Sequence, residues 1–513
     1  MKNSRFHLLR LLSDEHYLIV SVIAITIFTR TFHLTFQSLW FDELYSMIIA
    51  NPENSYKTIL QNIRTDFHPP LYYISLNTLF QILPYNDFTG RLISALAGIA
   101  GVFLIYFLGK ALKDKRTGIV MAFLTSIFFF HIKYSQEVRM YILICTLATL
   151  LTIIYINIIK KPGLKGYISY FFIAVLSIYT HYYAFFILLA HFFCLIHLAY
   201  FKKISKYHIR FFFSLLLLIS LAYIPWIPHL ISTGNRHHFM MQPDIWYFAE
   251  YLYEYTGKEP LTTIAILIVI FTYFGRNLRQ WIRKDQPQVD KNLTFLIIFY
   301  SLISVFIVTY LVSYFKPVLN KHSTIVAIPF LIAILSLEIG KLKTTTGHIV
   351  LILLLMSNFI NIAFINRYYV ANSKDNFRQI TKSIDNSAKL SGDSLVVSQM
   401  AILYNYYFRQ FGSGVRVINP NEFGPEAIIG NVDLFYVINS PFTEEKDQKL
   451  EPINELGFLI LYPDLEREVA NLKKNHNEWT DYIDDNFIID SSFIDNKKNF
   501  KVAFRYKRKS LSQ

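Results

Sequence analysis

The sequence has little charge for its length. Of its 513 residues only 17% are Asp, Glu, Lys or Arg, whereas 53% are hydrophobic and 17% are aromatic, and the mean hydropathy is +0.33. Soluble globular domains have about 25% charged residues and are less apolar. The composition therefore excludes a soluble protein and indicates an integral membrane protein.

Cysteine is also scarce. The two cysteines, Cys145 and Cys194, both lie inside apolar runs, which excludes a disulfide framework and a cysteine metal cluster. The formal charge of +14 comes from short basic clusters between apolar segments, which is how membrane topology is encoded. A nucleic-acid-binding protein would gather these residues on one face, so no nucleic-acid partner is expected.

About eleven apolar runs are predicted to cross the bilayer as helices. The first has no small-residue cleavage site after it, so it is expected to be retained rather than removed as a signal peptide. A further run, 69–83, is too short to span and is predicted to lie in the membrane interface. The spans are expected at about 17–36, 92–109, 117–132, 140–159, 166–183, 184–200, 209–230, 261–277, 293–315, 324–339 and 347–366.

Basic clusters follow every second span. The positive-inside rule assigns these clusters and the N-terminus to the cytoplasm. The opposite, outer face receives loops 37–91, 133–139, 180–183, 231–260 and 316–323.

The composition changes at about residue 370. Charged and Asn-rich stretches then alternate with short β-rich runs, which predicts a soluble α/β domain over residues 370–513 on the outer face. The predicted architecture is mainly α: a polytopic membrane domain over 1–369, with interfacial helices in loop 37–91, followed by this extracytoplasmic domain.

Unusual polar residues collect in the outer-face loops, and each has a structural alternative to a catalytic role. Asp42 and Glu43 fit the first turn of a helix, where acids are favourable. His68 fits a loop held extended by the prolines that follow it. Lys321 and His322 fit interfacial side chains, since long polar side chains reach toward the membrane surface.

Four motifs taken together resemble the GT-C glycosyltransferases. The similarity is strongest over residues 15–200 and is greatest to glycosyltransferase family 39, the branch of the protein O-mannosyltransferases and aminoarabinose transferases, in its bacterial form. The motifs are Trp40-Phe41-Asp42-Glu43, His68-Pro69-Pro70-Leu71-Tyr72-Tyr73, Gly90-Arg91-Leu92 and Tyr134-Ser135-Gln136-Glu137-Val138-Arg139-Met140-Tyr141.

This resemblance implies a glycosyltransferase in the bacterial cytoplasmic membrane. Such an enzyme moves a sugar from a polyprenyl-phosphate donor to a protein, lipid or glycan acceptor on the outer face, usually with inversion. By match to the family's Asp-Glu motif, Asp42 is the expected general base that deprotonates the acceptor. Glu43 would orient the acceptor or the base, and Glu137 fills the position of the second family acid.

The leaving phosphate requires cations, because its negative charge develops in the transition state. The residues expected to bind it are His68, Arg91, Arg139, Lys321 and His322. Tyr134 and His181 are expected to contact the sugar or the acceptor, although His181 also fits a structural histidine at a helix end. A divalent metal ion held by Asp42 and Glu137 is compatible with their hard oxygen ligands, and metal dependence stays open.

The chain departs from the family at two cation positions. His68 stands where the aminoarabinose branch has Lys, so its charge depends on protonation, and Lys321-His322-Ser323 stands where Arg-Tyr is frequent. Two other classes stay open. A lipid or sugar transporter would show charges inside its spans, and a non-catalytic envelope assembly protein would use the outer domain for binding.

Overall fold

The computed structural model describes most of the chain, and these residues fall into two compact units. The membrane unit contains Met1–Phe36 and Ile49–Ala371, and the C-terminal unit contains Gln37–Ile48 and Asn372–Gln513. The described residues are 15–66, 68–234, 243–282, 289–374, 377–391, 394–398, 400–419, 422, 433–439, 487–497 and 501–508.

The membrane unit is built from apolar helices. Within its described part, six are long and apolar enough to cross a membrane, or seven if one bent pair counts as a single span, and four are shorter. Together they cover every predicted span and confirm the polytopic, mainly α class. They are α2 (Glu15–Thr31), α6 (Asp87–Leu112), α7 (Lys115–Ser126) with α8 (Phe129–Ser135), α9 (Tyr141–Lys160), α10 (Leu164–Thr180), α11 (Ala184–Tyr200), α12 (Lys206–Tyr223) with α13 (Ile227–Gly234), α15 (Pro260–Ile282), α16 (Val289–Leu302) with α17 (Thr309–Phe315), α18 (Ile328–Ile339) and α19 (Thr344–Ile360).

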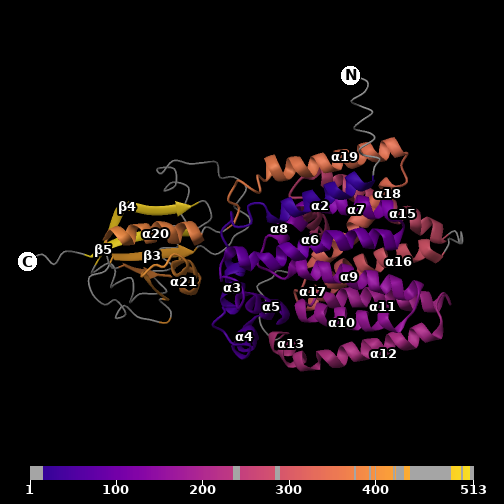
Figure 1. The fold of residues 1–513 in the computed structure, drawn as a ribbon, viewed down its shortest axis with the longest axis horizontal. Coiled ribbons are helices and arrows are strands. Elements are labelled where there is room, and N and C mark those ends of the chain that lie inside the picture. Colours follow the sequence, from indigo (N-terminus) through magenta and orange to yellow (C-terminus); the bar gives the residue numbers. More distant parts are fainter. Residues whose placement is uncertain are drawn as a thin grey trace, which may run out of the picture. The chain divides into compact units, whose positions relative to one another are not determined.

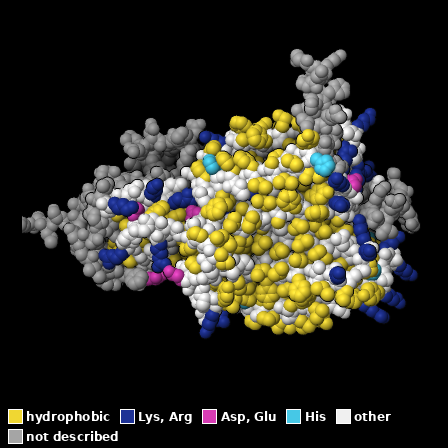
Figure 2. Space-filling model, viewed as in Figure 1, with side chains coloured by type: hydrophobic (Ala, Val, Ile, Leu, Met, Phe, Trp, Pro, Cys, Tyr) yellow, Lys and Arg dark blue, Asp and Glu magenta, His cyan; other side chains and the backbone are white. Residues whose placement is uncertain are grey.

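The exposed flank of the membrane unit is apolar. Figure 2 shows hydrophobic side chains over this flank and Lys and Arg side chains gathered at one end. Ile168, Phe172 and Leu217 are among the large exposed hydrophobic residues, as expected for a lipid-facing surface. Because successive spans run in opposite directions (Figure 1), the basic loops share one end of the unit, and the loops before α9, α11 and α18 share the other.

The span expected at 117–132 is not continuous. It breaks after Ser126, and α7 and α8 meet at 65°. Arg30, at the end of α2, is fully buried at the break; its guanidinium donates to the carbonyl oxygens of Thr125, at 2.9 Å, and of Ser126. The last carbonyls of a helix have no intrahelical donor, so Arg30 satisfies the end of α7 and stabilises the bend.

Three shorter helices also belong to this unit: α4 (Tyr56–Asn62), α5 (Leu71–Phe80) and α14 (Tyr247–Tyr255). α5 follows Pro69-Pro70, which cannot continue an earlier helix, and has 10 residues, too few to span a bilayer. It buries Tyr72 and Tyr73 completely. This anchors the loop that carries His68.

The C-terminal unit is an α/β structure. Its sheet has the order β2-β1-β3-β5-β4. In it β1 (Ser394–Val397) is parallel to β2 (Arg416–Ile418) and β3 (Asp433–Asn439), while β5 (Lys501–Arg508) is antiparallel to β3 and β4 (Phe487–Lys497). The unit also contains α20 (Phe377–Ser391), α21 (Ala401–Gln410) and α3 (Phe41–Ile49). Thus the segment that carries the Asp-Glu motif belongs to this unit, although it precedes the second span in the chain.

Candidate active site

Histidine, arginine and tyrosine side chains from distant parts of the membrane unit meet at the end opposite its basic loops. The His68 and His181 rings have centroids 5.5 Å apart. The Tyr141 ring lies 5.8 Å from His181 and stacks on His322 at 5.4 Å. We call this group the His68 cluster; its members are His68, Tyr134, Arg139, Tyr141, His181 and His322.

His68 is held by an aspartate that the motifs did not single out. Its Nδ1 lies 3.1 Å from Oδ1 of Asp66, and the Tyr73 hydroxyl donates to the other carboxylate oxygen. Burial by itself would raise the pKa of Asp66, but the charge and hydrogen bond of His68, the charge of Arg139 and the Tyr73 hydrogen bond together hold that pKa well below its usual value. An ionised carboxylate only accepts, so the Nδ1–H of His68 donates to it.

Arg139 faces the other side of the His68 ring. Its Nη2 lies 3.4 Å from His68 Nε2, and its guanidinium is 5.5 Å from the centroid of the Tyr141 ring, a cation–π arrangement. The backbone of Arg139 is fixed by hydrogen bonds to the carbonyl of Glu137, at 2.8 Å, and from Ser94 Oγ, at 3.2 Å. Arg139 and Glu137 are both buried, in the turn that follows the α7–α8 bend.

Two other histidines of the cluster act as neutral groups. His181 accepts from the backbone N–H of Tyr183 through Nδ1, at 3.1 Å, so its Nε2–H donates to Ser323 Oγ, at 3.2 Å. Burial, with His68 and Arg139, lowers the pKa of His181 well below its usual value, against the opposing effect of Asp66. His322 contacts the Tyr134 hydroxyl, and burial with Lys133, Lys321 and Arg139 likewise lowers its pKa. His322 therefore offers a hydrogen bond rather than the positive charge expected from the sequence.

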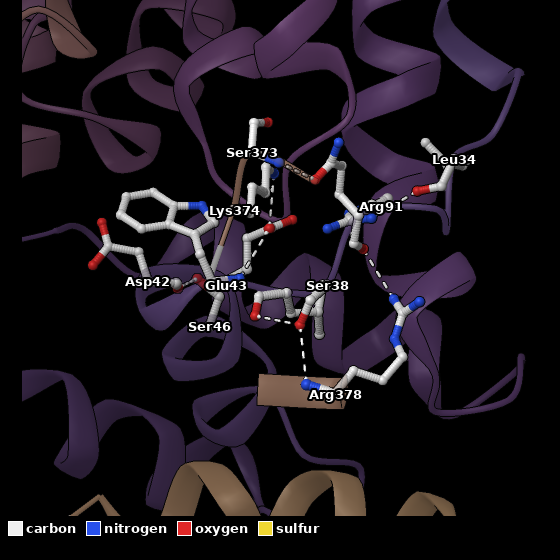
Figure 3. A network of polar contacts seen from close by, with 12 residues as sticks. Leu34, Ser38, Asp42, Glu43, Ser46, Arg91, Ser373, Lys374 and Arg378 are labelled. Atoms are coloured by element: carbon white, nitrogen blue, oxygen red, sulfur yellow. Dashed lines mark hydrogen bonds and ion pairs between the residues drawn. The ribbon is translucent and has the colours of Figure 1, made fainter. Parts of the chain in front are cut away.

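The two remaining predicted phosphate-binding residues contact other groups of the membrane unit. Lys321 lies 3.5 Å from Oε1 of Glu254, with its side chain partly exposed. Arg91, at the start of α6, is buried and donates to the carbonyl of Leu34 at 2.7 Å (Figure 3). Arg91 thus fastens the segment after α2 to α6, and its assignment to the phosphate stays a prediction.

The Asp-Glu motif opens α3 in the C-terminal unit. Glu43 is completely buried, and its Oε2 accepts a hydrogen bond from Lys374 Nζ at 2.9 Å. Asp42 is half-buried, and its carboxylate points away from the Glu43–Lys374 pair (Figure 3). Both acids lie in the first turn, where the helix dipole favours negative charge.

Metal binding stays a prediction. The described part of the chain contains no group of three or more His, Cys, Asp and Glu side chains that could hold a metal ion. Asp42 and Glu137, the expected shared ligands, belong to different units.

Sequence reasoning assigned no role to Asp66, Tyr73 or Lys374. The sequence does contain a signal for Asp66. It lies two residues before His68, close enough along the chain for its carboxylate to accept a hydrogen bond from the imidazole ring. Lys374 carries no local signal, since it lies 331 residues from Glu43.

Comparison with known proteins identifies the fold. Residues 67–229 match the family described as dolichyl-phosphate-mannose-protein mannosyltransferase, and no curated protein matches the sequence. The crystal structure of apo ArnT from Cupriavidus metallidurans superposes with a TM-score of 0.60 at 10% identity, over 95% of this chain and 97% of that one. The same protein bound to undecaprenyl phosphate gives 0.55 at 9% identity, with the same coverage. The chain is thus a multi-pass membrane protein with the GT-C, family-39-like fold that its motifs predict.

Proposed function

We propose that the protein is a membrane glycosyltransferase that transfers a sugar from a polyprenyl-phosphate donor to a protein, lipid or glycan acceptor. The observation that carries this proposal is the His68 cluster: a buried arginine and an aspartate-bound histidine at one end of a GT-C bundle. The match to a family named for a lipid-phosphate sugar donor, and the undecaprenyl phosphate bound by ArnT, support the donor class.

The cluster is suited to the leaving phosphate. Arg139 is permanently charged and can bind two phosphate oxygens at once. His68 positions this guanidinium: its Nδ1–H donates to Asp66 at 3.1 Å, and its Nε2 accepts from Arg139 at 3.4 Å. Lys321, paired with Glu254 at 3.5 Å, lies next to His322 of the cluster and is the remaining cation proposed for the phosphate. Interactions that strengthen as charge develops on the phosphate lower the barrier rather than only tightening binding.

Asp42 is the proposed general base. The acceptor hydroxyl attacks the anomeric carbon opposite the phosphate, its proton passes to the Asp42 carboxylate, and the bond from the anomeric carbon to the phosphate oxygen breaks with inversion. The electron pair leaves with the polyprenyl phosphate. Since Glu43 is buried against Lys374, its role is to orient the base rather than the acceptor.

The neutral groups of the cluster suit the sugar. The two nitrogens of neutral His181 are bonded to Tyr183 and Ser323, so it offers the sugar an uncharged ring. The Tyr134 hydroxyl can exchange hydrogen bonds with sugar hydroxyls without adding charge. Glu137 lies two residues before Arg139, where its carboxylate can orient the sugar or a metal ion.

The proposed location is the bacterial cytoplasmic membrane, with the N-terminus in the cytoplasm and the C-terminal unit outside. The basic loops at one end of the membrane unit support this orientation through the positive-inside rule.

Transfer of labelled sugar by the purified protein tests the proposal. The donors are mannose, glucose and arabinose derivatives of undecaprenyl and dolichyl phosphate, and wild type is compared with Asp42→Asn and Glu137→Gln in the same detergent. Loss of turnover in Asp42→Asn with unchanged thermal stability is expected. Glu53→Gln, in the same outer loop but exposed, is the matched control and should retain activity. Equal turnover in wild type and Asp42→Asn would contradict the assigned base.

A further inference from the structure

We propose that the C-terminal unit is a working part of the transferase, because its Lys374 fixes the orientation of the helix that carries Asp42. Lys374 would act through Glu43 and is therefore a positioning residue. This inference rests on the proposed role of Asp42 as the base.

The contact between Lys374 and Glu43 is a buried ion pair. The Glu43 side chain is completely buried, that of Lys374 is 8% exposed, and the charged atoms are 2.9 Å apart. Removing one partner of such a pair leaves an uncompensated buried charge, so the pair holds one arrangement strongly. Glu43 Oε2 also lies 3.4 Å from the backbone nitrogen of Trp40, which ties the pair to the start of α3.

A second set of hydrogen bonds fixes the residues just before α3 (Figure 3). The backbone N–H of Ser373 donates to Gln37 Oε1 at 3.1 Å, and the backbone N–H of Arg378 donates to Ser38 Oγ at 3.2 Å. The Arg378 guanidinium donates to the carbonyl of Gln37 at 2.9 Å. The segment 373–378 therefore holds both the approach to α3 and its first turn.

Helix α21 contributes a third anchor. The backbone N–H of Leu39 donates to the hydroxyl of Tyr407 at 2.9 Å, and that tyrosine is buried. All three anchors come from residues beyond 371, so the Asp-Glu motif is held within the C-terminal unit.

Fixing Glu43 also fixes the direction of Asp42. The two residues are consecutive in α3, and consecutive side chains of an α-helix differ by about 100° around its axis. Because Glu43 points into the buried ion pair, Asp42 lies about 100° away around the axis, on the half-buried side of α3. With only 9 residues, α3 is too short to be stable by itself, so its rotation depends on these contacts.

Lys374→Met is the decisive variant. We expect kcat to fall by about a hundredfold, the loss typical of a catalytic group misplaced by a remote change. The donor KM and the binding of undecaprenyl phosphate should stay unchanged, because the His68 cluster is intact. Hydrogen–deuterium exchange of the full-length protein in detergent should rise over residues 37–48 and not in α6 or α9. Lys374→Arg keeps the charge and should retain most of the activity.

Two further variants separate positioning from misfolding. Glu43→Gln combined with Lys374→Met removes both buried charges, so thermal stability should recover while kcat stays low. Lys382→Met removes an exposed lysine of α20 and should change nothing.

Unchanged exchange over residues 37–48 in Lys374→Met would overturn the inference. Raised exchange with normal kcat, or full activity in the double variant, would overturn it equally. If wild type turns over none of the donors, the proposed function fails. The exchange measurement still decides whether Lys374 holds the motif.

Discussion

Asp66 offers a test in which two physical effects predict opposite signs. Asp66→Asn keeps the size of the side chain and an oxygen for Tyr73, but removes the carboxylate that accepts from His68 Nδ1 at 3.1 Å. If Asp66 acts through His68, this change weakens the binding of undecaprenyl phosphate. If only long-range charge matters, removing a negative group beside Arg139 makes anion binding tighter.

The size of the effect follows from the hydrogen bond. A hydrogen bond to a charged group contributes about 1.5–3 kcal/mol, so losing the carboxylate that orients His68 against Arg139 should raise the Kd by roughly 10- to 100-fold. Tyr73→Phe leaves the carboxylate in place and removes one neutral donor, worth about 1 kcal/mol. It should change the Kd several-fold at most.

Binding of fluorescent undecaprenyl phosphate to the purified protein at pH 6.5 and low salt measures both variants. In a His68→Gln background Asp66→Asn should have little further effect, because groups that act through one another are not additive. Tighter binding in Asp66→Asn, or fully additive losses, would refute the reasoning.

Three other results are expected. His181 and His322 have lowered pKa values in the folded protein. Below pH 6.5 the unfolded chain therefore binds protons that the folded chain does not, and stability falls on acidification. The apparent Tm should drop between pH 7.5 and 5.5, and it should drop less in His181→Gln or His322→Gln. Arg30→Met removes the charged donor shared by two buried carbonyls of α7, which keep only the Phe128 N–H and the Thr29 hydroxyl as donors. A hydrogen bond to a charged group contributes about 1.5–3 kcal/mol, so thermal denaturation should show a lower Tm, and an unchanged Tm would exclude a structural role for the arginine. Gly109→Ala would place Cβ 2.7 Å from the backbone of Gly118 and should destabilise the α6–α7 contact by about 1–3 kcal/mol. Urea or thermal unfolding in detergent measures this loss. Gly163→Ala is the control, because its Cβ meets no atom within 4 Å.

The membrane helices were predictable because each long apolar run forms its own backbone hydrogen bonds, and lipid leaves few alternatives. Membrane sidedness also predicted that His68, Arg139, His181 and His322 would share one end of the bundle, since each follows or precedes a span at that end. What sequence could not supply depends on contacts between distant residues. The bend after Ser126 needs Arg30.

Burial determines the charge of the site in a way that no motif encodes. The sequence favoured a cation at His322, but its surroundings keep it neutral. The same limit applies to Glu43, whose partner Lys374 lies 331 residues later in the chain. The predicted boundary at residue 370 likewise kept residues 37–48 with the membrane helices. A single cut in the sequence cannot assign an early segment to a domain formed by later residues.

The bend held by Arg30 has a consequence for biosynthesis. The carbonyl oxygens that Arg30 binds are synthesised 95 and 96 residues later, so α2 enters the membrane with a charged side chain whose partners in α7 do not yet exist. Until α7 arrives, the arginine can reach polar surroundings only by extending toward the membrane surface. The first helix therefore takes its final depth and rotation only when α7 and α8 insert beside it.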